Sequence, residues 1–210
     1  FQVVNKLRWE IRQRFNIKKI KVGHAGTLDP LATGLLIICT GKQTKQIDTY
    51  QGQIKEYTGT FTVGATTPSY DLETEVDNTF NTDHISEELL KETTKQFIGE
   101  IQQKPPIFSA IKKDGKRLYE LARKGETTEI KARTVTVSEF EITKINLPEV
   151  EFRIVCSKGT YIRSIAFDYG NALNSGAHLS ALRRTKIGDF SVDNALSVEG
   201  FIENLKENTL

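Results

Sequence analysis

Residues 57–63 read Tyr-Thr-Gly-Thr-Phe-Thr-Val, so threonine occupies every second position of the stretch. Successive side chains of a β-strand point to opposite faces, and a period of two therefore predicts a half-buried strand with Tyr57 and Phe61 on one face. Comparable stretches near 131–145 and 150–157 predict further strands. In the second of these, the inward positions are apolar: Val150, Phe152, Ile154 and Cys156.

Apolar residues at helical spacing lie on both sides of these strands. Residues 2–15 carry an apolar face, and Ser86 followed by two glutamates predicts a helix that ends at Gly99. Further helices are expected near 116–124, 160–173 and 198–206, and further strands at 35–39 and 180–190. Because helices and strands do not alternate regularly, we expect an α+β fold with a mixed, mainly antiparallel sheet flanked by helices, rather than a doubly wound parallel sheet.

The composition is that of a globular chain. Of its 210 residues, 38% are hydrophobic and 27% are charged, which argues against disorder. The longest apolar run, residues 35–39, is far shorter than the roughly 20 residues of a membrane span, so no membrane association is expected. Cys39 and Cys156 have no metal-ligand spacing, and we interpret them as buried thiols of a cytoplasmic protein.

The charges are distributed unevenly along the chain. Residues 71–92 hold eight acidic residues and one basic residue, which leaves 28 basic and 19 acidic residues elsewhere. This asymmetry permits a basic face for a polyanion, and solvated surface charges are the alternative. The candidates for phosphate contacts are Lys18, Lys19, Lys21, Lys112, Lys113, Lys116, Arg117, Arg183, Arg184 and Lys186.

Several common site motifs are absent from the sequence. The three histidines are too scattered to suggest a metal site. The stretch Thr40-Gly41-Lys42 lacks the first glycine and the hydroxyl residue of a phosphate loop, and neither GxSxG nor GxGxxG occurs. A chemistry that needs no metal, nucleotide or flavin therefore fits this sequence best, and we expect no cofactor.

The most distinctive loop is residues 23–34, Gly-His-Ala-Gly-Thr-Leu-Asp-Pro-Leu-Ala-Thr-Gly. Its three glycines and one proline define a specific backbone path. Pro30 biases Asp29 toward an extended conformation and so restricts where its carboxylate points. Because Asp-Pro is also a common turn pair, the local chemistry alone leaves both a structural and a catalytic role open.

This loop resembles the catalytic-aspartate motif GHxGxLDPxATG of the TruB family of tRNA pseudouridine-55 synthases, in the bacterial stand-alone form. Four other blocks resemble segments of the same family in the same order, and together they cover nearly the whole chain. They are Lys55-Glu56-Tyr57, the stretch 105–119, the stretch 156–164 with Gly-Thr-Tyr-Ile-Arg, and Ala177-His178-Leu179 with Leu182-Arg183-Arg184.

The resemblance implies an isomerase that converts uridine 55 in the T-loop of tRNA to pseudouridine. The N1–C1′ bond breaks, the base rotates, and it rejoins through C5, so no atom is gained or lost and no cofactor is needed. The family places the nucleophile at Asp29, and a carboxylate suits this role because it can attack carbon and later leave. Attack at C6 of the base and attack at ribose C1′ or C2′ both remain open.

The resemblance also implies five substrate-binding residues. Arg163 would keep the nucleophile ionised, Tyr57 would stack on the target base, and Tyr161 would line the pocket and assist proton transfer. Leu182 would complete the pocket wall, and His24 would occupy the space vacated by the flipped base. Without the resemblance, Arg163 would be interpreted as a surface arginine and Tyr57 as an ordinary half-buried strand tyrosine. Leu182 would be interpreted as a core leucine and His24 as a structural histidine.

We expect residues 1–210 to form the catalytic domain, without the Lys-Pro strand that precedes this region in the family and without a C-terminal RNA-binding appendage. The expected partner is the tRNA T-stem-loop, with no obligate protein partner and no membrane. The alternatives are an RNA-binding protein without turnover, a guide-dependent synthase that needs protein and RNA partners, and, more remotely, a glycosidase, which generally needs a second carboxylate.

Overall fold

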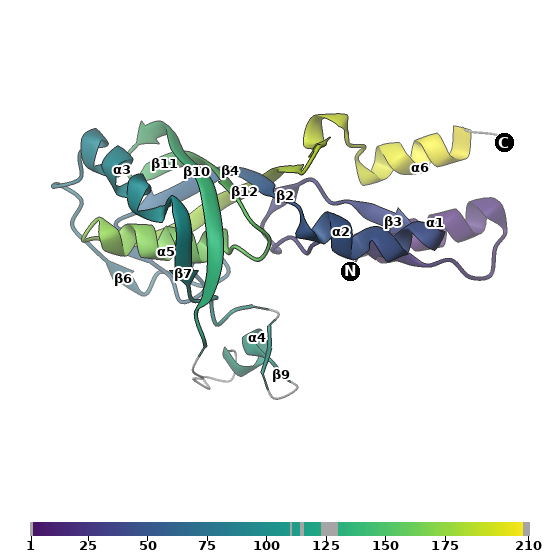
Figure 1. Ribbon diagram of the computed structural model, residues 1–210, viewed down its shortest axis with the longest axis horizontal. Coiled ribbons are helices and arrows are strands. Elements are labelled where there is room, and N and C mark those ends of the chain that lie inside the picture. The colour runs from purple at the N-terminus through teal and green to yellow at the C-terminus, as the bar shows by residue number, and fades with distance from the viewer. Residues whose placement is uncertain (1, 110, 114–115, 123–129, 208–210) are drawn as a thin grey trace. The chain divides into compact units, whose positions relative to one another are not determined.

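The computed structural model describes residues 2–109, 111–113, 116–122 and 130–207 (Figure 1). The chain forms two compact units. Unit 1 comprises Phe1–Lys55 and Arg184–Leu210, and unit 2 comprises Glu56–Arg183. Among the described residues, no helix has the length and apolar character that crossing a membrane requires.

Unit 1 is built around two helices from opposite ends of the chain. Its elements are α1 (Gln2–Phe15), β1 (Val22–His24), β2 (Thr33–Gly34), β3 (Ile38–Thr40), η1 (Gly41–Gln46), α2 (Ile47–Gly52), β13 (Phe190–Ser191), η3 (Val192–Asn194) and α6 (Val198–Glu207). The predicted helix over 2–15 is confirmed, and α1 buries Val4, Leu7 and Ile11. Helix α6 lies beside α1 (Figure 1), where Arg14 Nε donates to the Leu205 carbonyl at 2.9 Å.

The apolar run at 35–39 is not the continuous strand that its composition predicts. Strand β3 begins only at Ile38 and pairs antiparallel with β1. The main-chain N–H of Leu35 instead donates to the Arg184 carbonyl at 2.8 Å. Leu35 therefore bonds to Arg184, whereas Ile38 and Cys39 pair with β1, and for this reason no single strand spans the run.

Unit 2 contains most of the sheet. Its elements are β4 (Lys55–Val63), β5 (Ala65–Thr66), β6 (Asn78–Thr79), α3 (Glu87–Thr94), η2 (Lys95–Phe97), β7 (Gly99–Gln103), β8 (Lys112–Lys113), β9 (Lys116–Arg117), α4 (Leu118–Ala122), β10 (Arg133–Asn146), β11 (Glu149–Cys156), α5 (Ile162–Ala172) and β12 (Ala177–Ile187). The first residue of β4, Lys55, and the last four residues of β12, 184–187, belong to unit 1. The strand order is β12–β4–β11–β10–β7, with β10 antiparallel to both neighbours. The predicted α+β fold with a mainly antiparallel sheet is confirmed.

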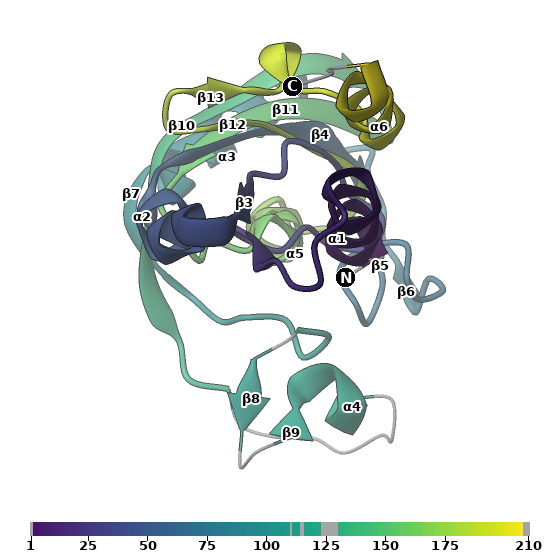
Figure 2. The same cartoon turned by 90° about the vertical axis from the view of Figure 1, so that its right-hand side faces the viewer.

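The core of unit 2 lies between the sheet and α5, and the strands curve around this helix (Figure 2). Phe61 stacks on Phe152 at a centroid distance of 4.1 Å, and both are almost fully buried. Tyr169 of α5 packs against Phe61, and its hydroxyl donates to the Leu90 carbonyl at 2.8 Å. A Cβ on Gly59 would lie 2.2 Å from the Ala181 carbonyl, so glycine permits the close approach of β4 to β12.

Two helix ends differ from the prediction. Helix α3 starts as expected, because Ser86 Oγ accepts the Leu89 N–H at 3.1 Å. It ends at Thr94 rather than near Gly99, since residues 95–97 tighten into a 3₁₀ turn and Gly99, with φ of 97°, opens β7. Helix α4 covers 118–122 of the expected 116–124, and residues 123–124 lie outside the described part of the chain.

Candidate active site

The loop with Asp29 belongs to unit 1 and lies between β1 and β2. Ala25 N–H donates to the Ile37 carbonyl at 2.9 Å, and Ala32 N–H donates to the Asp29 carbonyl at 3.0 Å. The second bond closes a four-residue turn with Pro30 at its second position, where the fixed φ of proline is favoured. The Asp29 side chain is half-buried.

Glycine is required at the end of this loop. Gly34 has φ of 102°, and a Cβ there would lie 2.2 Å from the Arg184 carbonyl oxygen. The loop therefore rests directly on the main chain of β12. Arg184 itself is 2% exposed. The expected phosphate contact at Arg184 is wrong, because a buried guanidinium that donates to main-chain carbonyls has no free face for RNA.

His24 ends β1 and is half-buried in unit 1. Within the described ranges, its Nδ1 is a buried nitrogen without a hydrogen-bond partner. Leaving a buried polar atom unpaired costs about 1–3 kcal/mol, so such atoms are rare in folded proteins and often belong to functional sites.

Arg163 lies near the start of α5 in unit 2 and is 3% exposed, so it is not the surface arginine of the alternative interpretation. Its Nε lies 3.5 Å from Oδ2 of Asp71, which is also buried. Its Nη1 donates to the Phe108 carbonyl at 2.9 Å and to the Ser69 carbonyl at 3.3 Å. The guanidinium is therefore held in one orientation by several groups.

Tyr161 is the N-cap residue of α5 and is held by both its main chain and its ring. The buried Gln103 amide accepts the Tyr161 N–H at 2.8 Å and donates to the Tyr161 carbonyl at 3.0 Å. The Arg133 guanidinium lies 4.7 Å from the ring centroid, and its Nη2 donates to the Gly159 carbonyl. This geometry is a cation–π contact that restrains the ring.

The Arg133 contact leads to a prediction. We expect Arg133→Met to lower kcat/KM roughly fivefold to thirtyfold, because loss of the stacked cation and its carbonyl contact removes about 1–2 kcal/mol of restraint on Tyr161. Steady-state kinetics on tRNA measure this. Lys144→Met is the matched control, since Lys144 lies on the same strand and is exposed. An equal effect of both substitutions would contradict the role of Arg133.

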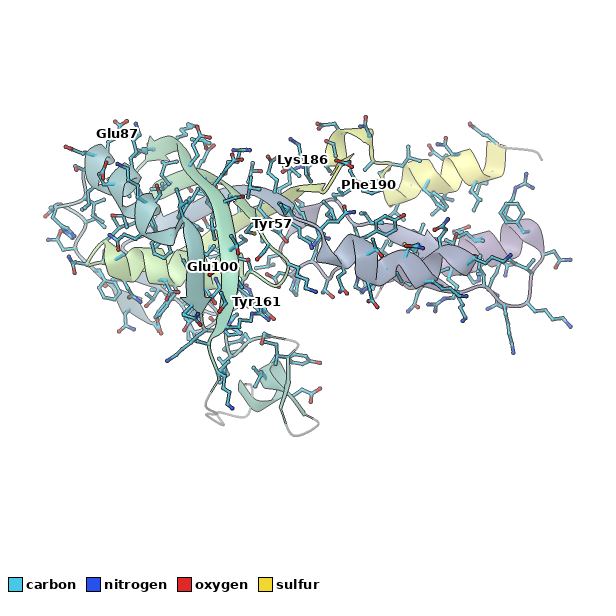
Figure 3. All side chains as sticks on the ribbon, in the orientation of Figure 1. Tyr57, Glu87, Glu100, Tyr161, Lys186 and Phe190 are labelled. Atoms are coloured by element: carbon cyan, nitrogen blue, oxygen red, sulfur yellow. The ribbon has the colours of Figure 1, made fainter. Side chains whose placement is uncertain are left out.

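Tyr57 and Leu182 lie on neighbouring strands of unit 2, β4 and β12. Both are half-buried and pack against the apolar core of that unit. Figure 3 shows the side chains of Tyr57 and Tyr161. Packing against the core restrains the Tyr57 ring, while its position at the edge of the core leaves the side chain only half-buried.

The six candidate residues are divided between the units. Asp29 and His24 belong to unit 1, whereas Tyr57, Tyr161, Arg163 and Leu182 belong to unit 2. Neither the contacts of Gln103 and Arg133 with Tyr161 nor the pairing of Asp71 with Arg163 was predicted from the sequence. A buried glutamine inside a strand and an aspartate far from its arginine leave no local sequence signal.

Solved structures share this fold. A chain of a Cbf5–Nop10–Gar1 complex matches with a TM-score of 0.69 and 28% identity over 94% of this chain and 49% of that one. A chain of the archaeal box H/ACA Nop10–Cbf5 complex matches with a TM-score of 0.67 and 25% identity over 97% of this chain and 51% of that one. The chain thus spans about half the length of these neighbours.

Curated relatives match over a larger share of their length. The tRNA pseudouridine synthase B of Flavobacterium johnsoniae is 67% identical over 98% of this chain and 90% of its own length. The protein of the same name from Phocaeicola vulgatus is 58% identical over 100% of this chain and 89% of its own length.

The sequence model described as "TruB family pseudouridylate synthase (N terminal domain)" matches residues 12–162. Fold, loop and matches together define a pseudouridine synthase, an isomerase that modifies RNA. Within that class, the chain belongs to the TruB family.

Proposed function

We propose that this protein isomerises uridine 55 in the T-loop of tRNA to pseudouridine, with Asp29 as the nucleophile. The observation that carries the proposal is the contiguous loop 23–34. Its aspartate lies in a closed turn, and the main chain around it is fixed by hydrogen bonds and by Gly34. The names of the relatives at 67% and 58% identity support tRNA as the substrate.

The roles of the other residues follow from what the reaction needs. The detached uracil must be held while it rotates, and the half-buried aromatic ring of Tyr57 is our candidate for stacking on it, an interaction worth about 1–3 kcal/mol per base. Tyr161 lines the pocket and assists proton transfer, and Leu182 completes its wall. Arg163 provides the positive charge that keeps a carboxylate nucleophile ionised. These groups supply binding and charge without a cofactor.

The target base lies inside a folded loop, so it must be flipped out of that loop before the reaction can take place. Extracting a base from a folded loop costs a few kcal/mol, which a side chain can offset by filling the space that the base leaves. His24 is our candidate for this role. His24 ends β1 beside the Asp29 loop and is only half-buried, so part of the side chain is open to solvent, which supports the proposal.

Phosphate contacts should make tRNA binding sensitive to salt. Lys18, Lys19, Lys21 and Lys186 are exposed in unit 1, and Arg183 is exposed in unit 2. The side chains of the remaining candidates at 112–117 lie outside the described residues. For about four to six phosphate contacts, a plot of log association constant against log salt concentration should have a slope of roughly −3 to −5. A flat plot in filter-binding titrations would contradict a basic RNA-binding face.

The experiment that tests the proposed function uses the protein alone. Because C5 of uridine becomes the glycosidic carbon, its hydrogen is released, so tRNA labelled with tritium at C5 reports turnover directly. We expect release from bare tRNA with no guide RNA and no second protein. Release that occurs only with partners would favour the guide-dependent alternative, and tight binding with no release would favour a binding protein. We place the protein in the cytoplasm, where this substrate is found.

A further inference from the structure

Arg184 has an environment that neither RNA binding nor ordinary packing explains. It lies on β12 and has the largest side chain among those that are almost fully buried in the described chain. Long charged side chains are rarely buried unless each polar atom has a partner. Here the partners are main-chain carbonyls of unit 1, and all of them belong to the loop that carries Asp29 or to the residue that follows it.

Each guanidinium nitrogen of Arg184 is directed to a different carbonyl. Nε donates to Leu35 at 2.8 Å, Nη2 donates to Gly26 at 3.1 Å, and Nη1 makes a longer contact of 3.5 Å with Thr27. Gly26 and Thr27 precede Asp29, whereas Leu35 follows it. A single planar group therefore joins the two ends of the loop and fixes the span between them.

The main chain of Arg184 holds the same loop. Its carbonyl accepts the Leu35 N–H at 2.8 Å, and a Cβ on Gly34 would lie within 2.2 Å of the same oxygen. Arg184 thus donates to the loop through its side chain and accepts from it through its main chain. Lysine cannot replace this arrangement, because an ammonium is a single point and cannot reach carbonyls at both ends of the loop in a fixed plane.

We infer that Arg184 is a positioning residue for the isomerase reaction, which sets the backbone of the Asp29 loop and through it the direction of the nucleophile. It does not contact the reacting atoms. A displacement of about 1 Å in a reacting group can lower a rate by about 10²-fold, so a loosened loop should reduce the chemical step far more than RNA binding. The inference rests on the proposed role of Asp29.

The test compares Arg184→Lys and Arg184→Ala with the parent enzyme in single-turnover tritium release and in tRNA binding. We expect both variants to bind tRNA within about threefold of the parent and to lose roughly 10²-fold in the rate of release. Guanidinium chloride at low millimolar concentration should raise the rate of tritium release by Arg184→Ala at least about tenfold, because the free ion refills the cavity between the carbonyls. It should restore nothing in Asp29→Asn.

Arg12→Ala serves as the contrast, since Arg12 is an exposed arginine on α1 of the same unit and we expect its loss to leave both tRNA binding and the rate of release within about threefold of the parent. A rate within threefold of the parent in folded Arg184 variants would overturn the inference. A loss that affects only tRNA affinity would also overturn it, and so would a rate of release that guanidinium does not restore. Unfolding of both variants, measured by circular dichroism, would assign Arg184 to stability alone. Turnover by Asp29→Asn would instead contradict the proposed nucleophile.

Discussion

Asp29→Asn is expected to lose about 10⁴-fold or more of the rate of pseudouridine formation while it still binds tRNA. Asparagine has nearly the shape of aspartate and fits the same turn, but its neutral amide is a very poor nucleophile toward carbon. Because the substitution removes a group that acts only during the reaction, the loss should fall on kcat and not on KM. Single-turnover tritium release and filter binding separate the two effects.

Asp48→Asn is the matched control for this prediction. Asp48 is exposed on α2 in the same unit, so its substitution should leave both rate and binding unchanged. A variant Asp29→Asn that retains more than a few per cent of the parental rate would show that another group performs the attack. A variant that loses tRNA binding together with its rate would mean that the loop shapes the binding surface instead.

Arg163→Met is expected to lower the free energy of unfolding by about 3–5 kcal/mol. The guanidinium lies 3.5 Å from the Asp71 carboxylate, and the two side chains are only 4% and 5% exposed. Removing the cation leaves a buried carboxylate without its counter-charge, and the Phe108 carbonyl also loses a donor. Urea unfolding at neutral pH measures the change. Activity should fall as well, because we propose that this cation keeps the nucleophile ionised.

The same substitution at Arg153 provides the comparison. Arg153 lies on β11, contacts Glu56 at 2.9 Å and Glu139 at 2.6 Å, and has a side chain that is 30% exposed. Hydrogen bonding to Glu139 raises its pKa. Solvent screens such ion pairs, so Arg153→Met should change the unfolding free energy by about 1 kcal/mol or less. If Arg163→Met and Arg153→Met lower the free energy of unfolding by the same amount, burial does not make the Arg163–Asp71 ion pair more important for stability than the more exposed pairs of Arg153.

Patterns that are local in sequence predicted most of the fold. The helix at 2–15 follows from one apolar face, the strand at 57–63 from its alternation, and the start of α3 from the Ser86 cap. Each of these signals acts over a few residues and needs no knowledge of the rest of the chain. The mainly antiparallel sheet followed from the absence of regular strand–helix alternation.

Features that depend on distant partners were not predicted. The apolar run at 35–39 divides because Leu35 bonds to Arg184, which lies far away in the sequence. Arg184 was assigned to the RNA surface for the same reason, since its carbonyl partners cannot be recognised from local sequence. The motif found the loop around Asp29, but only the three-dimensional structure reveals the Gln103 amide on Tyr161 and the Asp71 carboxylate on Arg163.

Isomerisation of uridine 55 is tested most directly by tritium release from two tRNA transcripts that are labelled at C5 of uridine and differ only at position 55. We expect release of a single equivalent per tRNA from the transcript with uridine 55 and none when cytidine replaces it. Release that persists from the cytidine transcript would show that another uridine is the target. No release from either transcript, with binding intact, would contradict the assignment of this chain as the isomerase of uridine 55.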